Sequence, residues 1–359
     1  VLEASKNQLG SLPESVGELR QLTTLSVSDN PLPASTMSKV SRLSSFLSAW
    51  SWVHQLRSAD GHSAGPLDYA LSSKDSLDLS GLGLRNLPHP VGELRQLKKL
   101  IIMENSLRAL PESIGRLGAL EELWAHTNQL ESLPESIGGL RQLKKLLVGE
   151  NSLRALPKSI GRLSALGELW AHTNQLESLP ESVGELRQLK KLIIMENSLR
   201  ALPESIGRLD ALMELWAYKN QLETLPESVV ELRQLKKLIV WGNLLRALPE
   251  SIGCLGALEV LEASKNQLGS LPESVGELKQ LKKLSIYENS LRALPESIGR
   301  LGALEVLEAS KNQLESLPES VVELRQLRRL IIDENSLSTL PLWIGRLQSL
   351  RELTATMNR

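Results

Sequence analysis

The chain has 359 residues, with 41 lysines and arginines against 42 acids, so its formal net charge is −1. Proteins that bind nucleic acid usually carry a basic face, so this balance argues against a nucleic-acid partner. No run of 18 apolar residues is present, so neither a transmembrane helix nor a membrane partner is expected.

The first 73 residues divide into two different segments. Residues 1–32 read as two partial coils of a repeat, because residues 1–21 are nearly identical to residues 260–280. Residues 33–73 lack the repeat and predict a helix from about Thr36 to Arg57. Its apolar side chains recur at three or four residues: Val40, Leu43, Phe46, Leu47, Trp50, Val53 and Leu56. We interpret residues 33–73 as a helical cap on the open end of the coils; the alternative is a linker between two arrays.

From residue 74 to residue 359, one pattern recurs every 23 residues. The stretch from Leu120 to Gln142 reads Leu-x-x-Leu-x-Φ-x-x-Asn-x-Leu-x-x-Leu-Pro-x-x-Ile-Gly-x-Leu, where Φ is apolar. These spacings fit a short strand, a turn and a return segment. One such coil cannot bury its apolar residues alone, so about 13 coils must stack. The expected strand centres are Leu100, Leu123, Leu146, Leu169, Leu192, Leu215, Leu238, Leu261, Leu284, Leu307 and Leu330.

Two positions define the turns of each coil, a polar asparagine and a rigid proline. Asn128 follows the strand, and its amide has both donors and an acceptor for backbone groups at the bend. We therefore expect this asparagine to be buried and bonded to backbone in each coil from Asn105 onward; in the first coil Leu82 stands in its place. Pro134 fixes φ on the return segment and excludes a long helix there.

This pattern resembles leucine-rich repeats, and the resemblance covers nearly the whole chain except about residues 33–73. The 23-residue Leu-Pro-x-x-Ile-Gly-x-Leu variant is similar to repeats of plant Ras-group-related leucine-rich-repeat proteins, Scribble and Erbin-type scaffolds, Roco proteins and bacterial effectors. The resemblance implies an α/β solenoid, a horseshoe with a parallel sheet on its concave face and short turn or 3-10 segments on the convex side. It also implies protein binding on the concave face.

No signature of catalysis or of nucleotide binding is present in the sequence. There is no Gly-x-x-x-x-Gly-Lys-Ser/Thr loop, no Gly-x-Ser-x-Gly and no Cys–His pair. We therefore predict a non-catalytic protein-interaction module, or scaffold, without a cofactor. Two alternatives stay open: the recognition arm of a larger enzyme, such as an effector ubiquitin ligase or a Roco GTPase, and a consensus-like array with no evolved ligand. Val1 and Arg359 both fall inside a coil, so a longer parent protein is expected.

The single cysteine, Cys254, cannot form the disulfide-bonded caps that are usual in secreted leucine-rich-repeat proteins. With the absence of any Asn-x-Ser/Thr sequon, this favours an intracellular, cytoplasmic setting, or the host cytoplasm for a bacterial effector. Cys254 replaces an arginine of the convex side and is expected to be an inert surface thiol.

His126 and His172 are the one candidate metal pair, but their backbones should lie about 10 Å apart, so no metal site is expected.

The outward-facing strand positions carry the predicted binding surface. The fifth and seventh positions of successive coils hold four of the seven tryptophans, and the fifth position changes to Glu262 and Ser285 in later coils. Tryptophan and tyrosine are enriched in binding hot spots. The alternative is that these residues only pack along the sheet as cross-strand pairs. With a polar rim from the third position, the predicted protein-binding residues are Ile101, Met103, Trp124, His126, Lys145, Leu147, Glu168, Trp170, His172, Lys191, Ile193, Met195, Glu214, Trp216, Tyr218, Ile239, Trp241 and Tyr287.

Overall fold

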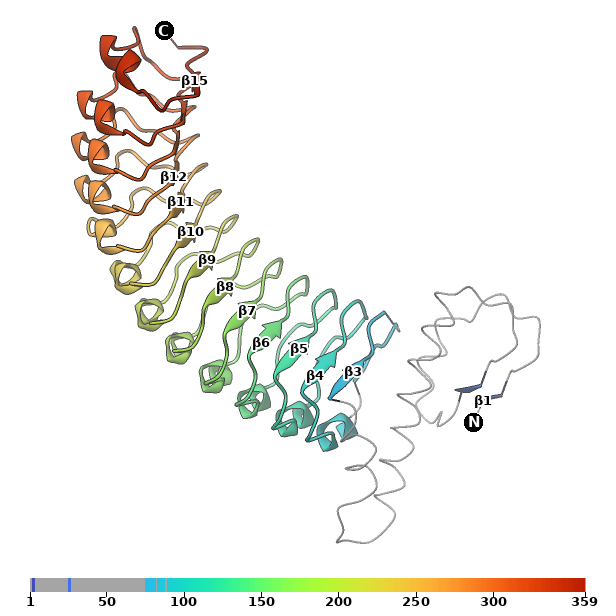
Figure 1. Cartoon of the computed structure of the whole chain (residues 1–359). Coiled ribbons are helices and arrows are strands. Elements are labelled where there is room, and N and C mark those ends of the chain that lie inside the picture. Colours follow the sequence, from blue (N-terminus) through green and yellow to red (C-terminus); the bar gives the residue numbers. More distant parts are fainter. Residues whose placement is uncertain (1, 4–24, 27–74, 82, 88, 359) are drawn as a thin grey trace. The chain divides into compact units, whose positions relative to one another are not determined.

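The computed structural model describes residues 2–3, 25–26, 75–81, 83–87 and 89–358 (Figure 1). The helix predicted from Thr36 to Arg57 lies outside these residues, as does most of residues 1–32. Two short strands are described in that N-terminal segment, β1 (Leu2–Glu3) and β2 (Leu25–Ser26), and they pair in parallel with Leu2 opposite Leu25.

The chain divides into two units, residues 1–168 and 169–359. In the first unit, four strands pair consecutively and in parallel: β3 (Ser76–Asp78), β4 (Lys99–Ile101), β5 (Glu122–Trp124) and β6 (Lys145–Leu147). The strand β7 (Glu168–Trp170) follows. The second unit continues with eight parallel strands: β8 (Lys191–Ile193), β9 (Glu214–Trp216), β10 (Lys237–Ile239), β11 (Val260–Glu262), β12 (Lys283–Ser285), β13 (Val306–Glu308), β14 (Arg329–Ile331) and β15 (Glu352–Thr354).

Every predicted strand centre is confirmed, because each of the predicted leucines is the middle residue of a three-residue strand. The return segments are short 3-10 helices, on the opposite side of each coil from the strand (Figure 1). They are η2 (His89–Glu93), η3 (Glu112–Arg116), η4 (Glu135–Gly139), η5 (Lys158–Arg162), η6 (Glu181–Glu185), η7 (Glu204–Arg208), η8 (Glu227–Glu231), η9 (Ile252–Cys254), η10 (Glu273–Glu277), η11 (Glu296–Arg300), η12 (Glu319–Glu323) and η13 (Leu342–Arg346).

Proline sets the start of nearly all these 3-10 helices. Pro134 has φ −68° and ψ 149°, an extended conformation, and η4 begins at the next residue. The helix ends at Gly139, and the next residue, Leu140, donates its backbone N–H to the carbonyl of Ile137. Because proline fixes φ and the buried leucine must turn inward, the 3-10 helix stays short, at five residues.

The interior consists of stacked leucine, isoleucine, valine and alanine side chains, one layer per coil. At the bend, Asn128 donates from Nδ2 to the carbonyls of Ile102 and Ala125, at 2.9 and 3.2 Å, and its Oδ1 accepts from Leu107 N–H at 3.0 Å. The same pattern recurs in later coils, so the predicted bonding of asparagine to backbone is confirmed. Burial is more variable than expected: Asn128 is buried, whereas Asn151 is half-buried.

The residue before this asparagine adopts a left-handed backbone conformation, a feature that the sequence analysis did not predict. Thr127 has φ 55° and Lys219 has φ 51°, whereas Gly242 fills the same place with φ 66° in the coil of β10. A non-glycine residue in this region costs about 1–3 kcal/mol. The asparagine amide, which bonds three carbonyls around the bend, offsets that cost.

Candidate functional site: the outward strand face

Tryptophan and isoleucine alternate at the outward position of the first four strands of the second unit's outward face, from Trp170 in β7 to Ile239 in β10. Trp216 lies in register between Ile193 of β8 and Ile239 of β10. Although their strand position faces outward, the two isoleucines are only 5% and 6% exposed, with the larger Trp216 in register beside both. These two predicted contact residues therefore offer little surface to a ligand, whereas Trp216 is half-exposed.

Aromatic rings of two neighbouring coils form a packed group, which we call the aromatic cluster: Trp216, Tyr218 and Trp241. The rings of Tyr218 and Trp241 are stacked, with centroids 4.5 Å apart and planes at 12°. The rings of Trp216 and Tyr218 are 6.4 Å apart. Aromatic pairs at such separations gain about 0.5–1.5 kcal/mol beyond area burial. In the coil of β7, Trp170 and His172 form an edge-on pair at 6.2 Å.

Charged side chains hold the aromatic cluster in place. Trp216 Nε1–H donates to Glu214 Oε2 at 3.1 Å. That carboxylate lies between two lysines, with Lys191 Nζ at 3.8 Å and Lys237 Nζ at 3.5 Å. The lysine and glutamate rim predicted from the third position of the repeat is thus connected to the indole, and it limits rotation of the tryptophan.

A second polar group adjoins Tyr218. Glu196 accepts from Lys219 Nζ at 2.6 Å and from Thr173 Oγ1 at 3.1 Å. The hydrogen bond from Lys219 lowers the pKa of Glu196 below its ordinary value and raises that of Lys219. Burial, together with the Glu196 charge, raises the pKa of Tyr218. Like any tyrosine, the phenol is protonated at neutral pH, and its O–H can donate a hydrogen bond to a ligand.

The first unit carries a smaller version of this arrangement around Trp124. Its Nε1–H donates to Glu122 at 3.1 Å, and Lys99 Nζ lies 3.7 Å from the ring centroid. Ile101 and Leu147 flank Trp124 in register. Three more predicted residues of the first unit, Met103, His126 and Lys145, are half-buried. Lys145 reaches Glu168 at 3.8 Å.

The outward face of the second unit becomes polar beyond β10. Lys283 Nζ lies 2.8 Å from Glu262, and Ser285 Oγ donates to Glu308 at 2.7 Å. These polar groups satisfy one another. Tyr287 belongs to this polar part: Lys265 Nζ lies 5.9 Å from its ring, and the coil of β11 separates it from Trp241. The predicted site residue Tyr287 is thus outside the aromatic cluster.

Three other features were considered at the described residues: metal binding, the cysteine and membrane-spanning helices. Among the residues that the structure describes, no three or more histidines, cysteines, aspartates or glutamates gather to bind a metal ion. Cys254 is exposed in η9, as expected for a convex residue. Over the same part of the chain, no helix has the length and apolar character needed to cross a bilayer.

The fold and the repeated strand face define a solenoid protein with one parallel strand per coil. A family model described as "Leucine-rich repeat region" matches residues 76–196 and 275–358, more than half of the chain. The chain therefore belongs to the leucine-rich-repeat family, a fold that implies a protein-interaction module. No curated protein sequence matches it.

Similar solved structures agree with this assignment. A leucine-rich-repeat protein of Leptospira interrogans is 31% identical with a TM-score of 0.58, over 81% of this chain and 93% of that one. YopM, a leucine-rich effector protein from Yersinia pestis, is 30% identical with a TM-score of 0.57, over 88% of this chain and 94% of YopM. The structure of PEPR1-AtPEP1 is 27% identical with a TM-score of 0.63, over 79% of this chain and 47% of that chain.

Proposed function

We propose that this protein is a non-catalytic interaction module that binds a protein or peptide through the outward strand face. The observation that carries the proposal is the stacked pair of Tyr218 and Trp241 beside the half-exposed Trp216. Tryptophan and tyrosine dominate hot spots in protein interfaces, where they sit centrally within a polar rim.

The aromatic cluster is ordered before any ligand arrives. Glu214 holds the indole of Trp216, and Lys219 lies 5.5 Å from the ring of Trp241. A side chain that is already fixed loses little conformational entropy on binding, where a free one costs about 0.5–1.5 kcal/mol. Trp216 ends β9, and Tyr218 and Trp241 each follow a strand by two residues, in short turns and not in long loops. We therefore expect binding to require no loop movement.

The size of this surface favours a short segment of a partner over a small metabolite. From Trp170 to Trp241 the outward positions belong to four successive coils, those of β7 to β10, an extent of about 14 Å at the usual strand spacing. One helix or one extended peptide fits this width. The structure of PEPR1-AtPEP1, a similar repeat protein, was solved as a complex, which supports the same class of function here.

The proposed function also concerns where the protein acts and whether it is part of a larger enzyme. We infer an intracellular role, as an effector or a scaffold, from the single cysteine and from the likeness to YopM. The same strand face would serve as the recognition arm of a larger enzyme. Expression of the full open reading frame, followed by assay for ligase and GTPase activity, separates a free-standing module from a recognition arm.

A partner is first captured with the parent protein. Its Kd is then measured for variants on the outward strand face and for a variant on the opposite side of the coil, where the 3-10 helices lie. Trp241→Ala and Tyr218→Ala are expected to weaken binding by about 2 kcal/mol or more, about thirtyfold in Kd. Arg208→Ala, at an exposed position of η7, is the matched control and should leave Kd unchanged. Loss of binding in Arg208→Ala, with both aromatic variants binding normally, would move the site to the 3-10 side. Thermal unfolding of each variant verifies that the fold is intact.

A further inference from the structure

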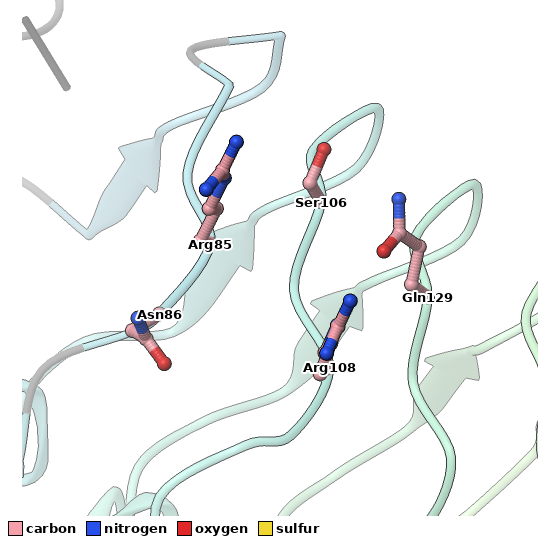
Figure 2. Close-up of a pocket in the computed structure, with 5 residues that line it drawn as sticks. All are labelled: Arg85, Asn86, Ser106, Arg108 and Gln129. Carbon is pink, nitrogen blue, oxygen red and sulfur yellow. The ribbon is translucent and has the colours of Figure 1, made fainter. Parts of the chain in front are cut away.

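A surface pocket of about 540 Å³ in the first unit is lined by Arg85, Asn86, Ser106, Arg108 and Gln129 (Figure 2). Figure 2 shows the side chains of Arg85 and Arg108 running in the same direction from neighbouring segments, with Asn86 turned elsewhere. Their polar ends do not meet at one point, so the pocket offers no convergent site for a ligand. The arrangement of charge beside the aromatic cluster is more informative.

One repeat position next to the lysine and glutamate rim loses an acid beside the aromatic cluster. It is the second position of each coil, immediately before the rim, and in the second unit it reads Lys190, Met213, Lys236, Glu259, Lys282, Glu305 and Arg328. Basic and acidic residues alternate from Lys236 to Arg328. Met213 stands where that alternation places an acid. The row therefore lacks one negative charge, and it lacks it between two lysines.

The backbone places Met213 directly between Lys190 and Lys236. Lys190 O accepts from Met213 N–H at 2.9 Å, and Met213 O accepts from Lys236 N–H at 2.8 Å. The two lysines are therefore two coils apart, about 10 Å at the usual strand spacing. Both lysine side chains are exposed, whereas Met213 is half-buried.

Further along the row, each basic residue has an acid of a neighbouring coil beside it. Glu259 lies 3.6 Å from Lys236 Nζ and 2.7 Å from Lys282 Nζ. Glu305 lies 2.9 Å from the guanidinium of Arg328. Lys190 makes no ion pair with a carboxylate in the part of the chain that the structure describes. Its charge is thus available to a ligand.

The result is a local excess of positive charge beside the aromatic cluster. In the coils of β8, β9 and β10, the second and third positions hold four lysines and one glutamate: Lys190, Lys191, Glu214, Lys236 and Lys237. The single glutamate already accepts the indole N–H of Trp216. In the next three coils the same positions hold two lysines and two glutamates, and the fifth position adds Glu262 and Glu308. At these positions the charge changes from net positive beside the aromatic rings to net negative beyond them.

We propose that the segment bound by the aromatic cluster is acidic: an apolar or aromatic anchor lies on the cluster, and aspartates or glutamates beside it face Lys190 and Lys236. This inference rests on the proposed function and adds the chemistry of the partner to it. A lysine ammonium and a carboxylate form short, charge-assisted hydrogen bonds. Charges at the edge of an interface mainly speed association and fix orientation, so the lysines select acidic partners from others that offer the same anchor.

A random linear peptide library displayed on phage tests the chemistry of the partner. Phage are panned on the parent protein, and the peptides that fail to bind Trp241→Ala are kept, because these depend on the aromatic cluster. We expect aspartate and glutamate to be enriched in the kept peptides relative to the input library. Kept peptides without this enrichment overturn the inference and leave the proposed function standing, whereas panning that yields no Trp241-dependent peptide overturns both.

One kept peptide is then synthesised, and its Kd is measured for charge variants at low and high salt. Met213→Glu restores the acid of the repeat pattern and should raise Kd by about threefold or more, mostly through slower association. Lys190→Gln removes one attraction and should raise Kd by about twofold to fivefold. In both variants Kd should depend less on salt than in the parent, because fewer attractive charges are left to screen.

Met213→Gln is the matched control for shape, because it changes the same side chain without adding charge. Arg328→Gln is the control for net charge, because it removes one cation at the same repeat position, in the coil of β14. With unfolding curves unchanged, both should bind the peptide as the parent does. Equal weakening by Met213→Gln and Met213→Glu, or by Arg328→Gln and Lys190→Gln, overturns the inference. Displacement of the peptide by single-stranded DNA at equal concentration also overturns it, since the surface would then bind polyanions in general.

Discussion

Gly207 of η7 packs directly against Ser228 of the next coil: a Cβ on Gly207 would lie 2.9 Å from the Ser228 Cβ, and closer still to its carbonyl oxygen. Real Cβ atoms do not approach so closely, so the spacing between η7 and η8 leaves no room for a side chain at Gly207. Valine takes this place in two coils, as Val230 in η8 and as Val322 in η12. The helix after η8, η9, is three residues long, whereas the helix after η12, η13, has five.

Gly207→Ala is expected to destabilise the protein by about 1–3 kcal/mol, the usual cost of an added group in a packed interface. Chemical denaturation measures this free energy of unfolding. Gly302→Ala is the matched control, because its Cβ would meet nothing within 4 Å and the same repeat position holds Ser164 and Asp210 in other coils. Equal loss in the two variants would show that helix contact is not the cause.

Asn220→Ala is expected to cost about 1–3 kcal/mol, because it leaves buried backbone groups without their partners. Asn220 is buried, donates to the carbonyls of Ile194 and Ala217 at 3.0 and 3.1 Å, and accepts from Leu199 N–H at 3.0 Å. Urea denaturation gives the value. The exposed neighbour Gln221 serves as control, since the free energy of unfolding of Gln221→Ala should stay within about 0.5 kcal/mol of the parent value. A neutral Asn220→Ala would contradict the role of the amide at the bend.

Trp216→Ala is expected to reduce stability as well as binding, by about 1–2 kcal/mol, because it uncovers Ile193 and Ile239. Trp216→Phe retains an apolar ring over the isoleucines but loses the bond to Glu214, so it should keep most of the stability. Differential scanning calorimetry compares the two. An unchanged melting temperature for Trp216→Ala would mean that the isoleucines owe their burial to other neighbours.

Asp333 is expected to give the C-terminal coils an acid-dependent stability. Burial opposes ionisation of this carboxylate, but bonds from Thr354 Oγ1 at 2.5 Å and from Thr356 N–H and Oγ1, both at 2.7 Å, lower its pKa below the ordinary 3.8. A lowered folded pKa means that the stabilising contribution is complete above about pH 3.8 and is lost as the pH falls through the folded value.

Hydrogen exchange of the Thr356 amide between pH 6 and pH 3, corrected for intrinsic rates, measures this contribution. Protection in the parent should fall toward acid, and Asp333→Asn should show weaker protection that changes less with pH. Parallel curves for parent and variant would rule out a role for Asp333 in this dependence.

The sequence alone determined the coil. Each repeat contacts its immediate neighbours, so the residues that stack are those 23 positions apart, and comparing repeats gives the register directly. For this reason the strand centres, the asparagine bonds at Asn128 and the proline start of the 3-10 helices were all predictable. The helical cap at residues 33–73 has no such repeat to define it and stays a prediction.

The tertiary structure decided what the outward positions expose. Whether a side chain at such a position is accessible depends on the sizes of its neighbours in the flanking coils, not on its own place in the pattern. Ile193 and Ile239 are buried beside Trp216, and Tyr218 stacks on Trp241 of the next coil.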